Sequence, residues 1–198
     1  MAKRDVRINI LDAAIDLFWK SSYHATNMND LSRAAKVNKA TVYQHFRSKE
    51  EIAIAAVERA LERTVTYIFE AAFEAKDDPL DRLNNIYQRI YDSHKPLYEQ
   101  DGFTRGCPFV NIGVELATST DDVREAVQSA FATFERYYQR IIEDLRASGR
   151  LAYDLSTEQL AHDLQNNMNA TLIDSKIQKR PEAILEGQAR ARRCLGGI

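Results

Sequence analysis

Four side chains that suit contact with nucleic acid lie close together in the first quarter of the chain. A cation, a hydroxyl, a phenol and an amide follow one another there, namely Lys39, Thr41, Tyr43 and Gln44. Ammonium and phenol groups bind phosphates, whereas amides and hydroxyls pair with the edges of bases. Residues 39–46 include no carboxylate, although a solvated helix face usually carries both signs of charge. The alternative is a solvated connector with ordinary polar residues, and the missing acidic groups favour contact with DNA.

Two short helices joined by a tight turn would present these side chains. Over residues 28–36, Leu31 and two alanines recur at helical spacing and form an apolar stripe. Over residues 39–46, Val42 and Phe46 are four positions apart and can both face inward. Because only two residues separate the two segments, the pattern predicts a helix-turn-helix.

A much longer helix is expected to follow. Ser48 and Glu51 have the spacing of a capping box, so this helix should begin at Lys49. Neither glycine nor proline interrupts it before about residue 75. Lys49 stands in its first turn, where the ammonium and the helix N-terminus both favour a phosphate.

The run from Tyr23 to Glu51 resembles the DNA-binding signature of the TetR family of repressors. That signature is close to G-Y-x-A-T-S-x-x-D-I-A-x-x-A-G-V-S-K-G-T-L-Y-Y-H-F-x-S-K-E-E-L. The positions that match are Tyr23, Ala25, Thr26, Asp30, Ala34, Val37, Lys39, Thr41, Tyr43, His45, Phe46, Ser48, Lys49, Glu50 and Glu51. The departures are Ser22, Asn27, Lys36, Asn38 and Ala40. Lys36 replaces a glycine in the turn, where a positive φ would be less favourable for lysine than for glycine.

The resemblance implies an all-α protein with a three-helix DNA-binding head over residues 1–50 and a six-helix ligand-binding and dimerisation body over residues 51–198. It also implies a repressor that binds a palindromic operator on double-stranded DNA as a homodimer and is released by a small molecule or reactive species. The residues expected to contact DNA are Thr26, Lys39, Ala40, Thr41, Tyr43, Gln44 and Lys49. An alternative is a ligand-independent DNA-binding or architectural protein of the same fold.

Composition and charge agree with this interpretation. With 7 Gly and 4 Pro in 198 residues and 44% hydrophobic residues, the chain has too few turn residues for a β-rich fold but enough apolar residues for a large core. The net charge of −2 divides into +4 over residues 1–50 and −6 over the remainder, so a basic head precedes an acidic body. No apolar run approaches the length of a membrane span and no signal peptide is evident, so we expect a soluble cytoplasmic protein.

The remainder of the chain is expected to be helical. Further helices are predicted over residues 5–21, 79–99, 108–117, 121–148, 155–176 and 181–194, with Pro96 kinking or ending the second of these. In the TetR family the last two helices pair across a twofold axis. The residues expected to supply that dimer interface are Leu160, Leu164, Met168, Leu172, Ile184 and Leu185.

The predicted body holds more aromatic and amide side chains than a plain core requires, which favours a small-molecule site. The candidate ligand-binding residues are Tyr87, Tyr91, Phe103, Cys107, Asn111, Glu115, Phe134, Tyr138, Asn166 and Asn169. The alternative is that the aromatic residues are ordinary core and the polar residues are solvated.

Three of these candidates form the motif G-C-x-x-x-N-x-x-x-E, made by Cys107, Asn111 and Glu115, which resembles a pattern in one branch of the TetR family. Some members of that branch sense electrophiles or oxidants through a cysteine, and the alternative is a buried structural thiol. The four histidines do not cluster with other ligands at metal spacing, so neither a metal site nor a cofactor is expected. No nucleophile–base pair or phosphate loop is evident either, so the sequence does not favour an enzyme.

Overall fold

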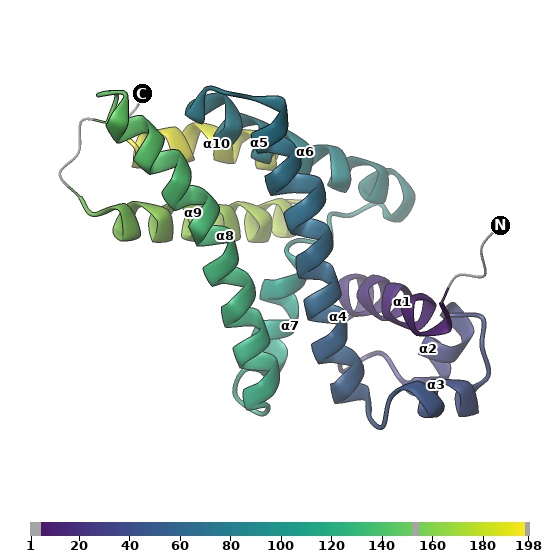
Figure 1. Cartoon of the computed structure of the whole chain (residues 1–198). Helices are drawn as coiled ribbons and strands as arrows, with labels where there is room; N and C mark the ends of the chain where they lie inside the picture. The colour runs from purple at the N-terminus through teal and green to yellow at the C-terminus, as the bar shows by residue number, and fades with distance from the viewer. Residues whose placement is uncertain (1–4, 152–154, 197–198) are drawn as a thin grey trace. The chain divides into compact units, whose positions relative to one another are not determined.

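The computed structural model describes residues 5–151 and 155–196, and the folded elements in these ranges are all helices (Figure 1). In chain order they are α1 (Val6–Ser21), α2 (Met28–Ala34), α3 (Lys39–His45), α4 (Lys49–Thr64), the π-helix η1 (Val65–Glu70), α5 (Ala71–Ala75), α6 (Pro79–Asp101), α7 (Pro108–Leu116), α8 (Asp121–Ala147), α9 (Thr157–Gln178) and α10 (Ala183–Cys194). Because α4, η1 and α5 follow one another without a break, they are the single helix predicted from residue 49 to 75. The all-α prediction is confirmed.

The distribution of contacts between Cα atoms divides the chain into two compact units. The first unit runs to Glu62 and includes Pro108–Ala130, whereas the second holds Arg63–Cys107 and the chain from Phe131 onward. Helices α4 and α8 each contribute to both units. Helix α7, predicted as part of the body, therefore belongs to the same unit as the helix-turn-helix. The predicted domain boundary at residue 50 stays a prediction.

The first unit is built on an apolar core shared by α1, α2, α3 and α4. Its fully or almost fully buried side chains include Ile10, Leu11, Phe18, Leu31, Val42, Phe46 and Ile52. Helix α1 packs against α2 and α7, and α2 packs against α3. Arg59 of α4 binds Asp12 of α1, with 2.7 Å between Nε and Oδ1, and so adds a charged hydrogen bond between two helices that are already packed.

Side-chain caps fix the two helices of the helix-turn-helix. Asn27 accepts hydrogen bonds from the N–H groups of Asn29 and Asp30 at 2.8 and 3.1 Å, and Asp30 accepts one from the Asn27 N–H at 3.2 Å. Asn38 accepts from the Thr41 N–H at 2.7 Å and so begins α3. Lys36, in the intervening turn, has φ of 56°, which confirms that this position needs the left-handed region.

The second unit packs α10 against both α9 and α6. Leu160, Leu164, Met168, Leu172 and Ile184 are at most 5% exposed within the single chain, so the prediction that they supply a dimer interface is wrong. They form this unit's own core, because the apolar stripe of α9 faces α10 of the same chain. The side of α9 that remains exposed carries Ile173 and Ile177.

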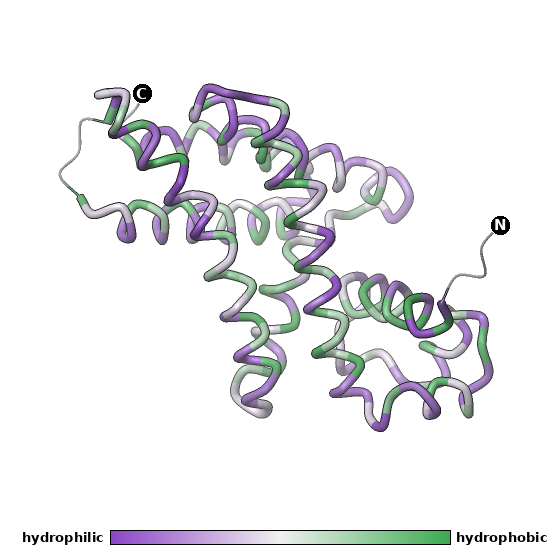
Figure 2. Tube along the Cα trace, in the orientation of Figure 1, coloured by the Kyte–Doolittle hydropathy of each residue, from purple (hydrophilic) through white to green (hydrophobic). Residues whose placement is uncertain are grey.

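Hydrophobic and hydrophilic residues alternate along most of the helices, as expected where one side of a helix is buried (Figure 2). Pro96 lies inside α6, which continues to Asp101, so the proline does not end the helix. Among the described residues, no helix combines the length and the apolar character needed to cross a membrane.

Candidate nucleic-acid interface and ligand site

Helix α3 presents a polar, carboxylate-free face to solvent. Lys39, Ala40 and Gln44 are exposed and Tyr43 is 49% exposed, whereas Val42 is fully buried. The hydroxyl of the half-buried Thr41 donates to the Asn38 Oδ1 at 2.9 Å. The inward and outward sides of this helix are those predicted from its period. The exposed side offers donors to phosphates and an amide to base edges.

The other two predicted DNA contacts, Thr26 and Lys49, make contacts inside the first unit. Thr26 is 2% exposed and its hydroxyl donates to the Ser22 carbonyl at 2.8 Å. The Lys49 Nζ donates to the carbonyls of Tyr23 and Thr26 at 3.0 Å each, and it lies 4.0 Å from the centre of the Tyr23 ring. Burial lowers the pKa of Lys49, and the charge of Glu115 partly opposes that shift. A DNA contact by Thr26 or Lys49 stays a prediction.

Two of the ten ligand candidates, Asn111 and Glu115, lie on α7 in the first unit. The Glu115 carboxylate accepts hydrogen bonds from the backbone N–H groups of Tyr23 and His24, at 3.3 and 3.1 Å. Asn111 Nδ2 donates to the Trp19 carbonyl near the end of α1 at 3.5 Å. Both side chains thus bind the backbone that leads into the helix-turn-helix. Contacts across about 90 residues of sequence leave no local pattern, so sequence reasoning missed this use of the motif.

Three other candidates, Tyr87, Cys107 and Tyr138, come together in the second unit. Tyr87 and Tyr138 are fully buried and Cys107 is 6% exposed. Burial raises the pKa of the Tyr138 phenol well above its usual value, and the neighbouring Tyr87 and Cys107 raise it further. The Tyr87 hydroxyl accepts a hydrogen bond from Asn167 at 2.6 Å, whereas the buried Tyr138 hydroxyl has no hydrogen-bond partner. A buried polar atom without a partner is unfavourable, so it marks a position that a ligand atom or a water would satisfy.

Aromatic rings extend this cluster. Phe134 stacks on Phe69 of η1 with ring centres 5.0 Å apart and an angle of 11° between the rings. Phe69 also meets the Tyr138 ring edge-on at 5.8 Å. Sequence reasoning missed Phe69 and also Asn167. The register of Asn167 could have identified it, because it lies seven positions after the buried Leu160 and four before the buried Thr171, on the same face of α9.

The remaining candidates are more dispersed. Tyr91 and Phe103 are half-buried, and Asn166 is exposed. Asn169 accepts a hydrogen bond from Gln165 Nε2 at 2.9 Å, while the other amide atom of Gln165, the buried Oε1, has no partner.

The loop that leads to Cys107 is held by buried polar contacts. Arg105 pairs with Asp101 at 2.7 Å, and both side chains are at most 2% exposed. The ring nitrogens of His94 lie 2.8 Å from the Ile90 carbonyl oxygen and 3.2 Å from that of Gly106. Burial lowers the pKa of His94 below its usual value. The guanidinium of Arg105, two residues before Cys107, is thus bound to a carboxylate.

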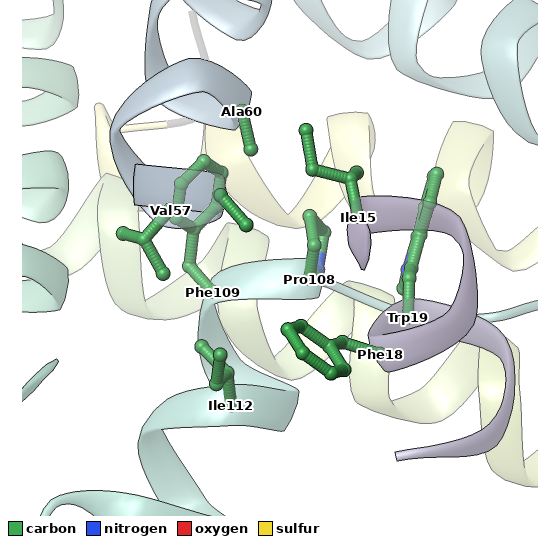
Figure 3. A pocket seen from close by; sticks show the side chains of 9 residues that line it. Ile15, Phe18, Trp19, Val57, Ala60, Pro108, Phe109 and Ile112 are labelled. Carbon is green, nitrogen blue, oxygen red and sulfur yellow. The ribbon is translucent and has the colours of Figure 1, made fainter. Parts of the chain in front are cut away.

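An apolar hollow in the first unit lies where α1, α4 and α7 meet. Side chains from all three helices converge on it, among them Phe18 and Trp19 of α1, Val57 of α4 and Phe109 and Ile112 of α7 (Figure 3). The hollow is small, with a cavity volume of about 20 Å³, and it is partly open to solvent. Packing of α7 against α1 is therefore apolar and nearly complete, because this volume holds about one water molecule. In residues 5–151 and 155–196, no group of three or more His, Cys, Asp and Glu side chains could hold a metal ion.

Comparison with known proteins covers almost the whole chain. The family model described as "Tetracyclin repressor-like, C-terminal domain" matches residues 79–193, and "Bacterial regulatory proteins, tetR family" matches residues 10–56. The HTH-type transcriptional repressor DhaR of Mycobacterium sp. (strain GP1) is 27% identical over 93% of this chain and 89% of its own length. The transcriptional regulator AcuR of Cereibacter sphaeroides is 23% identical over 89% of this chain and 78% of its own length. The crystal structure of regulatory protein TetR from Rhodobacter sphaeroides superposes with a TM-score of 0.84 at 22% identity, covering 96% of this chain and 98% of that one.

Proposed function

The chain belongs to the TetR family of transcriptional regulators, and we propose that it acts as a repressor that leaves its operator when a small molecule binds the second unit. The observation that carries DNA binding is the exposed face of α3, which offers Lys39, Tyr43 and Gln44 without a carboxylate. In this proposal Lys39 and Gln44 read bases, and Tyr43 contacts a phosphate. The relatives are regulators and not enzymes, so no catalytic activity is proposed. A chromosomal operator would place the protein in the cytoplasm.

The operator of a twofold-symmetric dimer should be a near-palindrome. Two α3 helices would enter successive major grooves about 34–36 Å apart. We propose that α9 and α10 form the dimer interface, through the exposed side of α9 that carries Ile173 and Ile177. These two side chains are 43% and 72% exposed in the single chain, and a partner helix would remove them from water.

The proposed effector site centres on Tyr138, Tyr87 and Cys107. An effector that brings a carbonyl or hydroxyl oxygen to the Tyr138 hydroxyl would satisfy a buried donor and place its apolar part against Phe69 and Phe134. Binding shifts DNA affinity only if the effector prefers one conformation of the protein over another. Oxidation or alkylation of Cys107 is a second route to the same shift.

Selection of operators from fragmented genomic DNA tests the proposal. The purified protein should enrich a near-palindromic sequence, and its affinity should fall steeply between about 50 and about 200 mM salt, because phosphate contacts release counterions. Tyr43→Phe should weaken binding to all sequences alike, while Gln44→Ala should relax preference at particular bases. If no sequence is enriched, the architectural alternative is favoured.

A further inference from the structure

The turn between α1 and α2 has an unfavourable backbone conformation. Ser22, directly after α1, has φ of 101° and ψ of 160°, a region that residues other than glycine rarely adopt. Such a conformation persists only where the surrounding contacts hold it in place. The turn also places Asn27, the residue whose side chain caps α2. Its conformation therefore decides where the helix-turn-helix begins.

Two side chains of opposite charge hold this turn from two different helices. Lys49 of α4 binds backbone carbonyls, those of Tyr23 and Thr26, whereas Glu115 of α7 binds the backbone N–H groups of Tyr23 and His24. The ammonium of Lys49 thus meets the negative ends of carbonyl dipoles, and the carboxylate of Glu115 meets the positive ends of N–H dipoles. Hydrogen bonds to charged groups are stronger than neutral ones. Together, Lys49 and Glu115 make hydrogen bonds to four backbone groups that have no partner within a helix.

Helix α7 is the part of this arrangement that can respond to events elsewhere in the chain. It begins at Pro108, immediately after Cys107, which lies in the Tyr87–Tyr138 cluster of the second unit. Its apolar side, Phe109 and Ile112, packs against α1 around a small hollow. Because Cys107 is bonded directly to Pro108, a shift at Cys107 displaces the first residue of α7.

We propose that Glu115 is a positioning residue for operator binding, which holds the Tyr23–His24 turn against Lys49 and releases it when α7 moves. The inference rests on the proposed function, since it assumes that the helix-turn-helix binds an operator. It assigns Glu115 to transmission of the signal and not to contact with the effector. When Glu115 releases the turn, the side chains exposed on α3 stay the same. The turn that precedes α2 is then no longer held in place, so the positions of α2 and α3 are less well fixed.

The test compares Glu115→Gln with Glu125→Gln. Glu115→Gln keeps the shape of the side chain but removes its charge, and an NH₂ group takes the place of one acceptor oxygen. The second removes the same charge from an exposed position in the first unit. In Glu115→Gln, the amides of Tyr23 and His24 should exchange with deuterium about 10 to 100 times faster, and operator affinity should fall by about tenfold or more. Glu125→Gln should match the wild-type protein in both measurements.

The two readouts separate this inference from the proposed function. If the wild-type protein selects no operator, the proposed function fails, and amide exchange still tests the clamp. If the wild-type protein binds an operator and Glu115→Gln binds it equally well, the positioning role is overturned. Exchange in the wild-type protein is a further test that needs no variant. Since Tyr23 and His24 lie outside any helix, rapid exchange of both amides there would also overturn the inference.

Discussion

Replacement of Gly187 by alanine should destabilise the protein, although alanine is the better helix former. Gly187 lies within α10, at the point where this helix crosses α9. A Cβ atom placed there would lie 2.5 Å from Thr171 Cγ2, 3.0 Å from Thr171 Cβ and closer still to Thr171 Oγ1. Thr171 is fully buried, so it cannot turn away into solvent. The two helices must move apart or the threonine must leave its rotamer.

The magnitude follows from two opposing terms. An additional methyl group in a packed core costs about 1–3 kcal/mol, while glycine to alanine inside a helix contributes about 1 kcal/mol of stability. The contacts with Thr171 are shorter than real Cβ atoms tolerate, so the cost of the added methyl group should lie in the upper part of its range. After the gain in helix propensity is subtracted, the free energy of unfolding should fall by about 1–2 kcal/mol. For a chain of this length, that is a decrease in Tm of about 2–8 °C. Separation of the helices would also stretch the hydrogen bond from Asn167 to the Gly187 carbonyl, now 3.1 Å.

Urea and thermal unfolding followed by circular dichroism measure the change, at one fixed protein concentration because dimerisation raises apparent stability. Gly113→Ala is the matched control. It is the same substitution within α7, but its Cβ would meet Val127 at 3.3 Å, so that side chain needs to shift by only a few tenths of an ångström. Adding Thr171→Ala to Gly187→Ala should recover part of the loss, with a coupling of about 0.5–3 kcal/mol. A Gly187→Ala protein that melts at or above the wild-type temperature would refute the argument.

Three further outcomes follow from the structure. Ser22→Gly should be more stable than Ser22→Ala by about 1–2 kcal/mol in urea unfolding, since release of backbone strain outweighs the entropy of glycine; equal midpoints would contradict the strain. Burial lowers the pKa of His94 in the folded state, so the unfolded chain binds a proton at this residue more tightly than the folded chain does. The free energy of unfolding should therefore fall as the pH drops below about 6.5, by at most about 1.4 kcal/mol per pH unit. His94→Gln should flatten that slope in urea titrations, and an unchanged slope would assign it to other groups. Ile177→Glu should raise the dimer dissociation constant by about tenfold or more in sedimentation velocity, while Val114→Glu, at an equally exposed aliphatic position on α7, should not; equal effects would argue against α9 as the interface.

The sequence was sufficient to predict the local elements, because helix period and caps are local signals. The spacing of Val42 and Phe46 assigned the buried side of α3, and the side chains of Asn27 and Asn38 cap the helices that follow them. The same signals could not identify the partner of a helix. The apolar stripe of α9 that includes Leu164 has the same period whether it packs against α10 or against a second chain, and the chain uses it for its own core.

In the candidate site, too, the sequence predicted some residues but not the partners that they contact. Tyr87 and Tyr138 were predicted as ligand-binding aromatics, and the structure brings them together with Cys107, although ligand binding there stays a prediction. The partners of Glu115 could not be predicted, because a carboxylate that accepts from backbone N–H groups places no requirement on the residue types that donate. The donors are backbone groups about 90 residues away in the sequence, so no local motif identifies them.

Two departures from the family signature explain why the turns of the head need support. Ser22 and Lys36 stand where the TetR signature has glycine, and both have positive φ in the structure, 101° and 56°. The conformation at these positions is therefore set by the fold of the head and not by the local residue, since each residue with a Cβ would favour another backbone region. Because these residues flank α2, a change of backbone conformation at either position would displace the helix that supports α3. The contacts of Glu115 and Lys49 then stabilise a head that its own turns disfavour, and a chain of this kind needs only to lose one such contact to weaken its hold on DNA.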